Sequence, residues 1–230
     1  MKIGIIGAMA EEVALLKQHL GVQSVETIAG CEYTIGQMHG KEIVLLQSGI
    51  GKVNAAMSSA ILMEKYAPDC VINAGSAGGF HRDLHVGDVV ISSEVIHHDM
   101  DATAFGYEYG QVPGMPPAFA ANEKLVQLAE EAAQSLVDVQ VLKGLIATGD
   151  AFIHTPDQRQ AVLERFPNVH AGEMEAVAIA QVASQFNIPF VIIRSLSDIA
   201  GDNSGISFAQ YLAKAAENSA QLIMKMVEKL

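Results

Sequence analysis

The sequence predicts a single-domain α/β fold with a central mixed, mostly parallel β-sheet flanked by helices. Short β-branched runs alternate with longer stretches of helical periodicity, which is typical of a parallel sheet covered by helices. The composition is 50% hydrophobic but only 6% aromatic and lacks Trp, so small aliphatic residues must build the core. No charged linker, repeat or low-complexity tract interrupts residues 1–230, so we expect one domain.

We expect the first half of the chain to alternate between strands and helices. Residues 2–6 have the pattern of a buried strand, and residues 32–48 that of a hairpin. Residues 70–79 predict a buried strand that runs into a small-residue turn, and residues 86–92 predict another strand. Apolar residues at helical spacing predict two helices, one through Met9, Val13, Leu16 and Leu20 and one through Val53, Met57, Ala60 and Ile61.

The second half repeats this alternation. Residues 144–150 and 189–198 predict two more strands, separated by an Ala-rich helical pattern at roughly 173–186. Helices are also expected over residues 123–136 and 207–229. Their core-facing residues are Leu125, Leu128, Ala132 and Leu136 in the first and Phe208, Leu212, Ala215, Leu222 and Met226 in the second.

One long irregular stretch, residues 97–118, interrupts the pattern. It holds three of the seven prolines and three of the thirteen aromatic residues, Phe105, Tyr107 and Tyr109. Long loops without secondary structure are usually functional or disordered in compact domains, and the aromatic residues argue against disorder. We therefore expect a lid or an interface, with a surface loop of no particular role as the alternative.

Charge and cysteine content exclude several classes of protein. The formal net charge is −12, and affinity for nucleic acid comes mainly from neutralising phosphates, so we expect no nucleic-acid partner. Cys31 and Cys70 are too few for a disulfide framework or a Cys-rich metal site. No apolar run approaches the ~18 residues of a membrane span, so we expect no membrane partner. Glu11 and Glu12 stand where a secretory signal would need a cleavage site, so we expect a cytoplasmic protein.

Five of the predicted strands end in small or polar residues. These ends are GAM after Ile6, SGIG after Gln47, GSAGG after Ala74, TGDAF after Ala147 and SLSD after Arg194. Open α/β sheets bind ligands at the carboxyl ends of their strands. Gly and Ser are common in any single turn, but five such turns together predict one ligand-binding rim.

The familiar nucleotide and metal motifs are absent. Lys52 in SGIGKV lacks the leading Gly and the following Ser or Thr of a phosphate-binding loop, and neither GIIGAM nor AGSAGG starts a dinucleotide fingerprint. His97 and His98 stand beside Asp99 and Asp101, but neighbours on an extended segment point to opposite sides and no second His cluster completes the set. We therefore expect no metal and no cofactor.

A serine esterase is one alternative that the motifs leave open. The sequence AGSAG around Ser76 differs by one residue from the nucleophile elbow GxSxG. In that interpretation Ser76 is the nucleophile, Asp150 orients the base, and either His154 or His170 is the base.

Separated carboxylates are more informative. Glu11 and Glu12 open the first predicted helix, where the helix dipole favours anions. Glu173 and Glu175 lie in an otherwise uncharged run, and Asp198 ends a buried strand, where a carboxylate is unfavourable unless it is paired or used. Acids from three segments on one rim suit glycosyl chemistry, in which an acid protonates the leaving group and a base activates water. Ordinary helix caps and solvated charges are the alternative.

Seven blocks in this order resemble a known family. They are GIIGAMAEE, SGIGKVNA, NAGSAGG, DATAFGYEYGQVP, GDAFI, EMEAVAIA and RSLSDIAG. Over almost its whole length the chain resembles the bacterial 5′-methylthioadenosine/S-adenosylhomocysteine nucleosidases, which belong to the nucleoside phosphorylase superfamily. The resemblance implies that fold, a homodimer, and adenosine nucleosides as small-molecule substrates.

The resemblance also implies roles for individual residues. Glu12 would activate the attacking water, Asp198 would protonate adenine N7, and Glu175 would hold the ribose hydroxyls. The remaining residues implied to bind substrate are Met174 against the sugar, Ser76, Gly78 and Arg194 around the water and ribose, Phe152 and the backbone of Ile153 at the adenine, Ser197 beside Asp198, and Met9, Ile50 and Phe208 around the 5′-thio group. Phe105 in the loop 97–118 would complete the 5′-thio pocket of the partner subunit.

We therefore expect a hydrolase that cleaves the N-glycosidic bond of 5′-methylthioadenosine, S-adenosylhomocysteine and 5′-deoxyadenosine to adenine and the 5-substituted ribose. Protonation of N7 makes adenine a neutral leaving group, and a carboxylate beside the sugar stabilises the positive charge that develops there. A phosphate dianion beside Glu12 would be repelled, which favours water as nucleophile. A purine nucleoside phosphorylase, the Ser76 esterase and a purine-binding module without activity are the alternatives.

Overall fold

The computed structural model describes residues 1–136, 139–202 and 204–230. Its strands are β1 (Lys2–Gly7), β2 (Gly21–Ile28), β3 (Cys31–Met38), β4 (Lys41–Gln47), β5 (Cys70–Gly79), β6 (Val89–His97), β7 (Phe119–Ala120), β8 (Val141–Thr148), β9 (Val169–Glu173) and β10 (Phe190–Ile199). Its α-helices are α1 (Ala10–His19), α2 (Lys52–Tyr66), α3 (Glu123–Ala133), α4 (Pro156–Arg165), α5 (Ala176–Gln185) and α6 (Ser204–Lys229).

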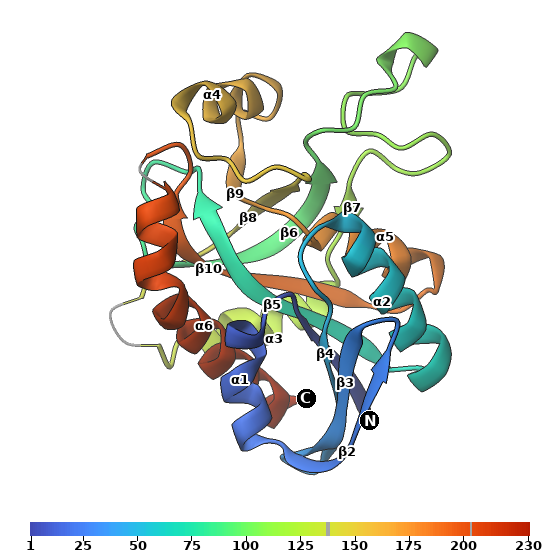
Figure 1. Ribbon diagram of the computed structural model, residues 1–230. Helices are drawn as coiled ribbons and strands as arrows, with labels where there is room; N and C mark the ends of the chain where they lie inside the picture. Colours follow the sequence, from blue (N-terminus) through green and yellow to red (C-terminus); the bar gives the residue numbers. More distant parts are fainter. Residues whose placement is uncertain (137–138, 203) are drawn as a thin grey trace.

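The sheet is mixed, and part of it closes on itself. β5 pairs in parallel with β1 and β10 and antiparallel with β9. β10 pairs antiparallel with β6, and the parallel pairs β6–β8 and β8–β9 lead back to β5. These five strands therefore form a ring, from which β1, β4, β3 and β2 extend the sheet outward (Figure 1).

Helices cover both sides of the sheet. α6 packs on β5 and β10 and contacts α1 and α3, whereas α2 and α5 pack against each other on the opposite side (Figure 1). The predicted α/β fold with a central mixed sheet and flanking helices is confirmed. No helix in the described part of the chain is both long enough and apolar enough to cross a bilayer.

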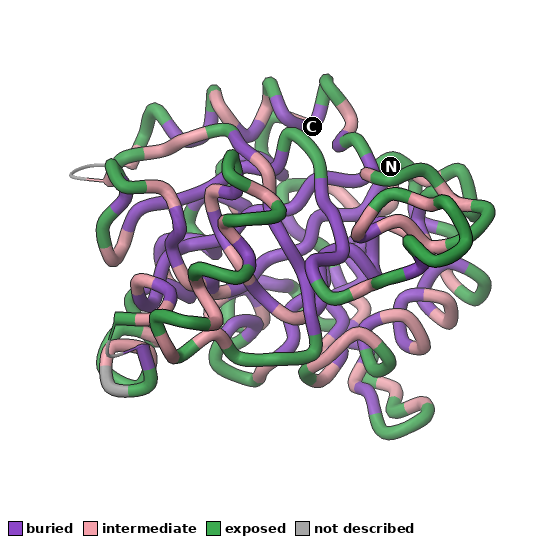
Figure 2. The backbone as a smooth tube through the Cα atoms, turned by 90° about the horizontal axis from the view of Figure 1, so that it is seen from above, coloured by how far each residue is buried: buried purple, intermediate pink, exposed green. Residues whose placement is uncertain are grey.

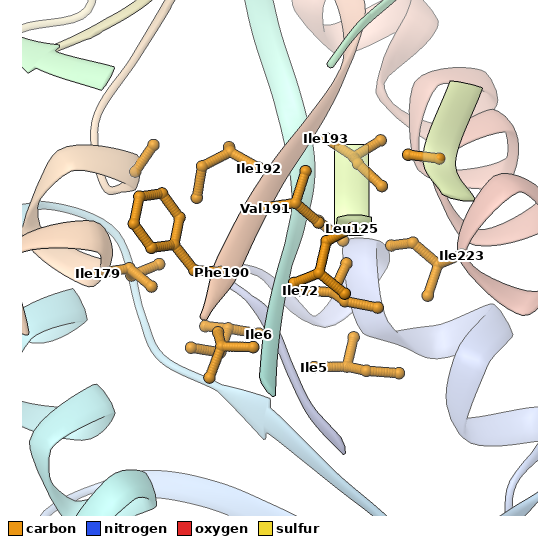
Figure 3. Packing of buried hydrophobic residues seen from close by; sticks show 14 of the residues in the cluster. Ile5, Ile6, Ile72, Leu125, Ile179, Phe190, Val191, Ile192, Ile193 and Ile223 are labelled. Carbon is orange, nitrogen blue, oxygen red and sulfur yellow. The ribbon is translucent and has the colours of Figure 1, made fainter. Parts of the chain in front are cut away.

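The core shows the alternation of side chains that a sheet between two helical layers requires. In β10, Val191 and Ile193 point towards Ile223 of α6, while Ile192 points to the other side (Figure 3). Ile179 of α5 lies on that other side, and all five side chains are fully buried. Figure 2 shows the buried residues concentrated along the central strands, with exposed residues on the outer helical turns and loops.

Several elements differ from the expectations. β2, α4 and β9 lie where no separate element was expected. β2 is largely exposed and α4 buries only Val162, so neither carries a strong apolar pattern. α5 begins at Ala176 instead of residue 173, because β9 continues to Glu173. Val53 does not face the core, because α2 buries a different stripe through Ala55, Ser58 and Leu62.

The loop between β6 and β7 projects from the body of the molecule (Figure 1). It contains a short 3₁₀ helix, Thr103–Phe105, and the Phe105 side chain is 83% exposed. Phe105 is therefore not part of the core that the described residues of a single chain form.

Candidate active site

A cavity of about 340 Å³ lies where the ends of β1, β4 and β9 meet the second half of β5 and the end of β10. All five predicted strand ends contribute to it, because Phe152 follows β8 and completes one wall. The predicted rim is therefore a single cavity, although GSAGG and SLSD continue their strands and do not form turns. The predicted site residues that line it are Met9, Glu12, Ile50, Ser76, Gly78, Phe152, Met174, Glu175, Ser197, Asp198 and Phe208.

Three predicted site residues lie outside this lining. Ile153 borders a hollow of about 30 Å³ that continues the cavity past Phe152 and shares Gly78 and Asp198 with it. Arg194 is 1% exposed and lies behind the cavity wall, paired with carboxylates. Phe105 lies on the projecting loop and touches neither hollow of its own chain.

Glu12 is held in one orientation at the start of α1. One carboxylate oxygen accepts hydrogen bonds from the backbone N–H groups of Ala8 and Met9, at 2.8 and 3.1 Å. The other oxygen accepts from the backbone N–H and the hydroxyl of Ser76, at 2.9 and 3.0 Å. Because Glu12 is the third residue of α1, it caps the helix and lines the cavity at the same time.

Asp198 presents a buried and unpaired oxygen to the cavity. Its Oδ1 accepts a hydrogen bond from the Ser197 hydroxyl at 2.9 Å, whereas Oδ2 has no hydrogen-bond partner. Burial raises the pKa of Asp198, and hydrogen bonds from Ser197 and Ser204 oppose that effect only partly. A buried Asp of this kind holds a proton more readily than an exposed one, and its protonated carboxyl group can act as a proton donor.

Gly78 keeps the space beside Asp198 free. A Cβ atom at this position would lie 3.1 Å from Asp198 Oδ2. The absence of a side chain at Gly78 therefore lets the acid face the cavity and its adjoining hollow.

Glu175 lies across the cavity at the amino terminus of α2. Its Oε1 accepts a hydrogen bond from the backbone N–H of Gly51 at 2.9 Å. Burial raises the pKa of Glu175, the nearby carboxylate of Glu173 raises it further, and Arg194 acts in the opposite direction. Glu175 is thus a buried carboxyl group near the sugar end that the resemblance implies, and its Oε2 lies 3.8 Å from Arg194 Nη2.

Glu173 lines the cavity, although the sequence analysis gave it no role in the site. Glu173 accepts from the backbone N–H groups of Glu175 and Ala176, at 2.9 and 2.8 Å, and so caps α5. It also accepts hydrogen bonds from the Thr148 hydroxyl and from Arg194, whose Nη2 lies 2.5 Å away. The pair Glu173 and Glu175, two residues apart in an uncharged run, was the signal that could have identified it.

Arg194 can occupy its buried position only because residue 75 is a glycine. Its Nη2 also donates to the side-chain oxygen of Asn73 at 2.7 Å. A Cβ atom at Gly75 would lie 2.2 Å from Arg194 Nη1 and 3.0 Å from Glu12 Oε1. Gly75 therefore lets the guanidinium approach the Glu12 side of the cavity while Glu173 holds its other end.

The other walls of the cavity are aromatic and apolar. Phe152 and Phe208 meet edge to face with their ring centroids 5.8 Å apart. Met9, Ile50 and Met174 add apolar surface, and most of the exposed lining is apolar. The cavity thus combines carboxyl groups with flat and aliphatic surfaces, which suits a ligand with an aromatic base and an apolar substituent.

The esterase and metal interpretations find no support in this geometry. Ser76 donates its hydroxyl to Glu12, while His154 and His170 each bond a backbone carbonyl, those of Phe152 and Asn168. Among the residues that the structure describes, no group of three His, Cys, Asp or Glu side chains is placed to hold a metal ion.

Comparisons with known proteins agree with this geometry. A family model described as "Phosphorylase superfamily" matches residues 2–228. A curated 5′-methylthioadenosine/S-adenosylhomocysteine nucleosidase of Bacillus thuringiensis is 59% identical over 230 residues, which is 100% of both chains. The crystal structure of such a nucleosidase from Neisseria meningitidis, in complex with methylthio-immucillin-A, is 44% identical with a TM-score of 0.97, covering 100% of this chain and 99% of that one. The one from Colwellia psychrerythraea, in complex with adenine, is 48% identical with a TM-score of 0.98, covering 100% and 96%.

Proposed function

The chain belongs to the phosphorylase superfamily and, within it, to the 5′-methylthioadenosine/S-adenosylhomocysteine nucleosidases, and we propose that it hydrolyses the N-glycosidic bond of these two nucleosides and of 5′-deoxyadenosine. The products are adenine and the 5-substituted ribose. One observation carries the proposal above all. A single cavity holds an oriented carboxylate, Glu12, and a buried acid with a free oxygen, Asp198.

In this mechanism Asp198 protonates adenine N7, so that the base leaves as a neutral molecule. Phe152 stacks on the adenine, and the backbone of Ile153, in the adjoining hollow, contacts its edge. Burial raises the pKa of Asp198 above that of an ordinary aspartate, which supports its role as the acid. General acid catalysis of this kind contributes about 10²–10⁴-fold to rate.

Glu12 acts as the base that activates water. Its four hydrogen bonds fix the carboxylate at the end of the cavity near Ser76 and Glu175. Glu175 binds the ribose hydroxyls, and its carboxyl oxygens face the oxocarbenium-like sugar as the glycosidic bond breaks.

Water is favoured over phosphate as the nucleophile. Glu12, Glu173 and Glu175 surround the sugar end of the cavity, and the nearby Arg194 already pairs with Glu173 at 2.5 Å. A phosphate dianion at this place would meet carboxylates with no unpaired cation to balance it, and such repulsion is strong away from bulk water.

Three exposed large apolar residues support a homodimer. Ile50 lines the cavity mouth and is 50% exposed, Val53 on α2 is 78% exposed, and Phe105 on the projecting loop is 83% exposed. Large apolar residues that a single chain leaves in solvent can be buried at an interface between subunits. In the dimer that we propose, the loop 97–118 lies at the interface, and Phe105 closes the partner subunit's 5′-thio pocket beside Ile50 and Phe208. We also propose a cytoplasmic location.

Chromatographic detection of free adenine tests the activity. The purified protein, incubated with 5′-methylthioadenosine, should release adenine at the same rate with and without phosphate. Release only after phosphate is added would indicate a phosphorylase. If no adenine were released in either condition, the protein would be a purine-binding module without activity or an esterase.

A further inference from the structure

Three charged side chains join three separate segments just outside the cavity. Lys52 is the first residue of α2, Asp99 lies at the start of the projecting loop, and Asp150 follows β8 two residues before Phe152. The Lys52 ammonium donates to Asp99 Oδ1 at 2.6 Å and lies 3.9 Å from Asp150 Oδ2. Two backbone hydrogen bonds complete the cluster, from Lys52 N–H to Asp150 Oδ1 at 2.8 Å and from Asp150 N–H to Asp99 Oδ2 at 2.9 Å.

This cluster is connected to the site through Gly51. The N–H of Gly51 donates to Glu175 Oε1, and the next N–H along the chain, that of Lys52, donates to Asp150. Gly51 itself offers no side chain to cap α2, and its φ of 94° is one that other residues rarely adopt. The Gly51 N–H that binds Glu175 is therefore held in place by the hydrogen bond of the neighbouring Lys52 N–H to Asp150, because Gly51 has no side chain to do so.

Charge balance explains why Lys52 is needed. Asp150 and Glu175 both accept hydrogen bonds at the amino terminus of α2, where the helix dipole favours anions. Although burial alone raises it, the Lys52 ammonium and the Asp150 N–H hold the pKa of Asp99 below its ordinary value. Without the Lys52 charge, the carboxylates of Asp99 and Asp150 would repel each other, which would push these segments apart.

We propose that Lys52, Asp99 and Asp150 form a clamp that positions the Gly51 amide on Glu175, and that this clamp determines how strongly the enzyme recognises the ribose hydroxyls. The proposal rests on the proposed function, because it assigns Glu175 to those hydroxyls. None of the three clamp residues lines the cavity, so they are positioning residues that act through Gly51 and Glu175.

The clamp residues are partly exposed, so we expect the clamp to fix local geometry and to contribute little to the free energy of unfolding. The side chains of Lys52, Asp99 and Asp150 are 20%, 31% and 49% exposed. Ion pairs this accessible contribute little to the free energy of unfolding. Their loss should therefore leave the fold intact and act on ligand binding.

The test compares Asp150→Ala with Asp150→Asn on two substrates. One is 5′-methylthioadenosine, and the other is its analogue without the 2′ and 3′ hydroxyls. Asp150→Ala removes the acceptor for the Lys52 N–H, so kcat/KM for the full substrate should fall about tenfold, mainly through KM. The analogue cannot use Glu175, so its kcat/KM should change much less. Asp150→Asn keeps a side-chain oxygen for the Lys52 N–H and should recover most of the loss.

Two further variants complete the design. Lys65→Met removes an ion pair with Glu26 from the far end of the same helix and should leave both substrates unaffected. Lys52→Met opens the clamp from its other side and should reproduce the selective loss seen with Asp150→Ala.

The results distinguish failure of the clamp proposal from failure of the role assigned to Glu175. If Glu175→Gln loses discrimination between the two substrates but Asp150→Ala and Lys52→Met do not, the clamp is wrong and the role of Glu175 stands. If Glu175→Gln itself does not change that discrimination, the assigned role of Glu175 fails first. An equal loss on both substrates in the clamp variants would also overturn the proposal, because it would show a general structural defect.

Discussion

Asp198 is the residue with the sharpest chemical assignment, because its Oδ2 is buried without a partner. Asp198→Asn keeps the shape and the hydrogen bond from Ser197 but removes the proton that the leaving adenine needs. We expect kcat to fall by about 10²–10⁴-fold with the melting temperature close to that of the wild type. A folded Asp198→Asn protein that retains most of its kcat would remove Asp198 from the acid role.

Glu12→Gln should separate binding from chemistry. An amide oxygen is too weak a base to activate water, so turnover should be lost. Glu12 is assigned to the water and not to the adenine, so calorimetry should still detect binding of an uncleavable substrate analogue. Loss of binding together with activity would instead show that Glu12 acts only as the cap of α1 or as a binding residue.

Glu175 should make the stability of the ligand-free protein depend on pH. Its pKa is raised by burial and by Glu173 from 4.5 to about 8, so the folded state binds its proton more tightly than the unfolded state. The resulting stabilisation is fully present below pH 4.5 and is lost as the pH rises through about 8. The melting temperature of the wild type should therefore fall, relative to that of Glu175→Gln, over this range.

Glu11→Gln is the matched control for this measurement, because Glu11 is exposed on α1. Its melting temperature should follow that of the wild type throughout. If the wild type instead gained stability over Glu175→Gln as the pH rose, pairing with Arg194 would outweigh burial, and the direction of the shift would be wrong.

At the scale of single elements, one face of α2 packs in the core and another face is exposed for the proposed dimer interface. It buries Ala55, Ser58 and Leu62 and leaves Val53, in its first turn, exposed. Val53→Glu should therefore weaken the proposed dimer without unfolding the subunit, as sedimentation measured over a range of protein concentrations can show. Val25→Glu on β2 is the control, because Val25 is 48% exposed but lies away from the proposed interface. Equal effects of the two changes would argue against α2 as the interface.

The elements that the sequence predicted well are those with a strong apolar period. The buried strands at residues 2–6, 70–79 and 189–198 and the helix at 123–136 carry clear patterns, and the structure contains all of them. β2 and α4 escaped prediction because they are mostly exposed, so hydrophobic periodicity has little to mark.

The cavity itself could be predicted from five strand ends, but its internal support could not. Asn73, Thr148 and Glu173 hold Arg194 and the start of α5 through contacts between distant parts of the chain. Such contacts depend on the closure of the strand ring, which pairs β9 with β5. Local sequence patterns carry no information on that pairing.

At the scale of the whole molecule, we predict that each site needs two subunits. Phe105→Ala should raise KM for alkylthio substrates more than for adenosine, because each buried methylene contributes about 0.8 kcal/mol. The decisive version mixes Phe105→Ala subunits with Asp198→Asn subunits. If the loop acts across the dimer, one site of each mixed dimer carries both defects and the other carries neither, so activity should return. No recovery after verified subunit exchange would place Phe105 in the site of its own subunit.

The arrangement of the three carboxyl groups around one nucleoside is the central claim, and a crystal structure with an uncleavable 5′-methylthioadenosine analogue tests it most directly. We expect purine N7 within hydrogen-bond distance of Asp198 Oδ2, the ribose hydroxyls on Glu175, and a water between Glu12 and the anomeric carbon. A nucleoside bound with its purine at Glu12, or with Asp198 facing the sugar, would contradict it.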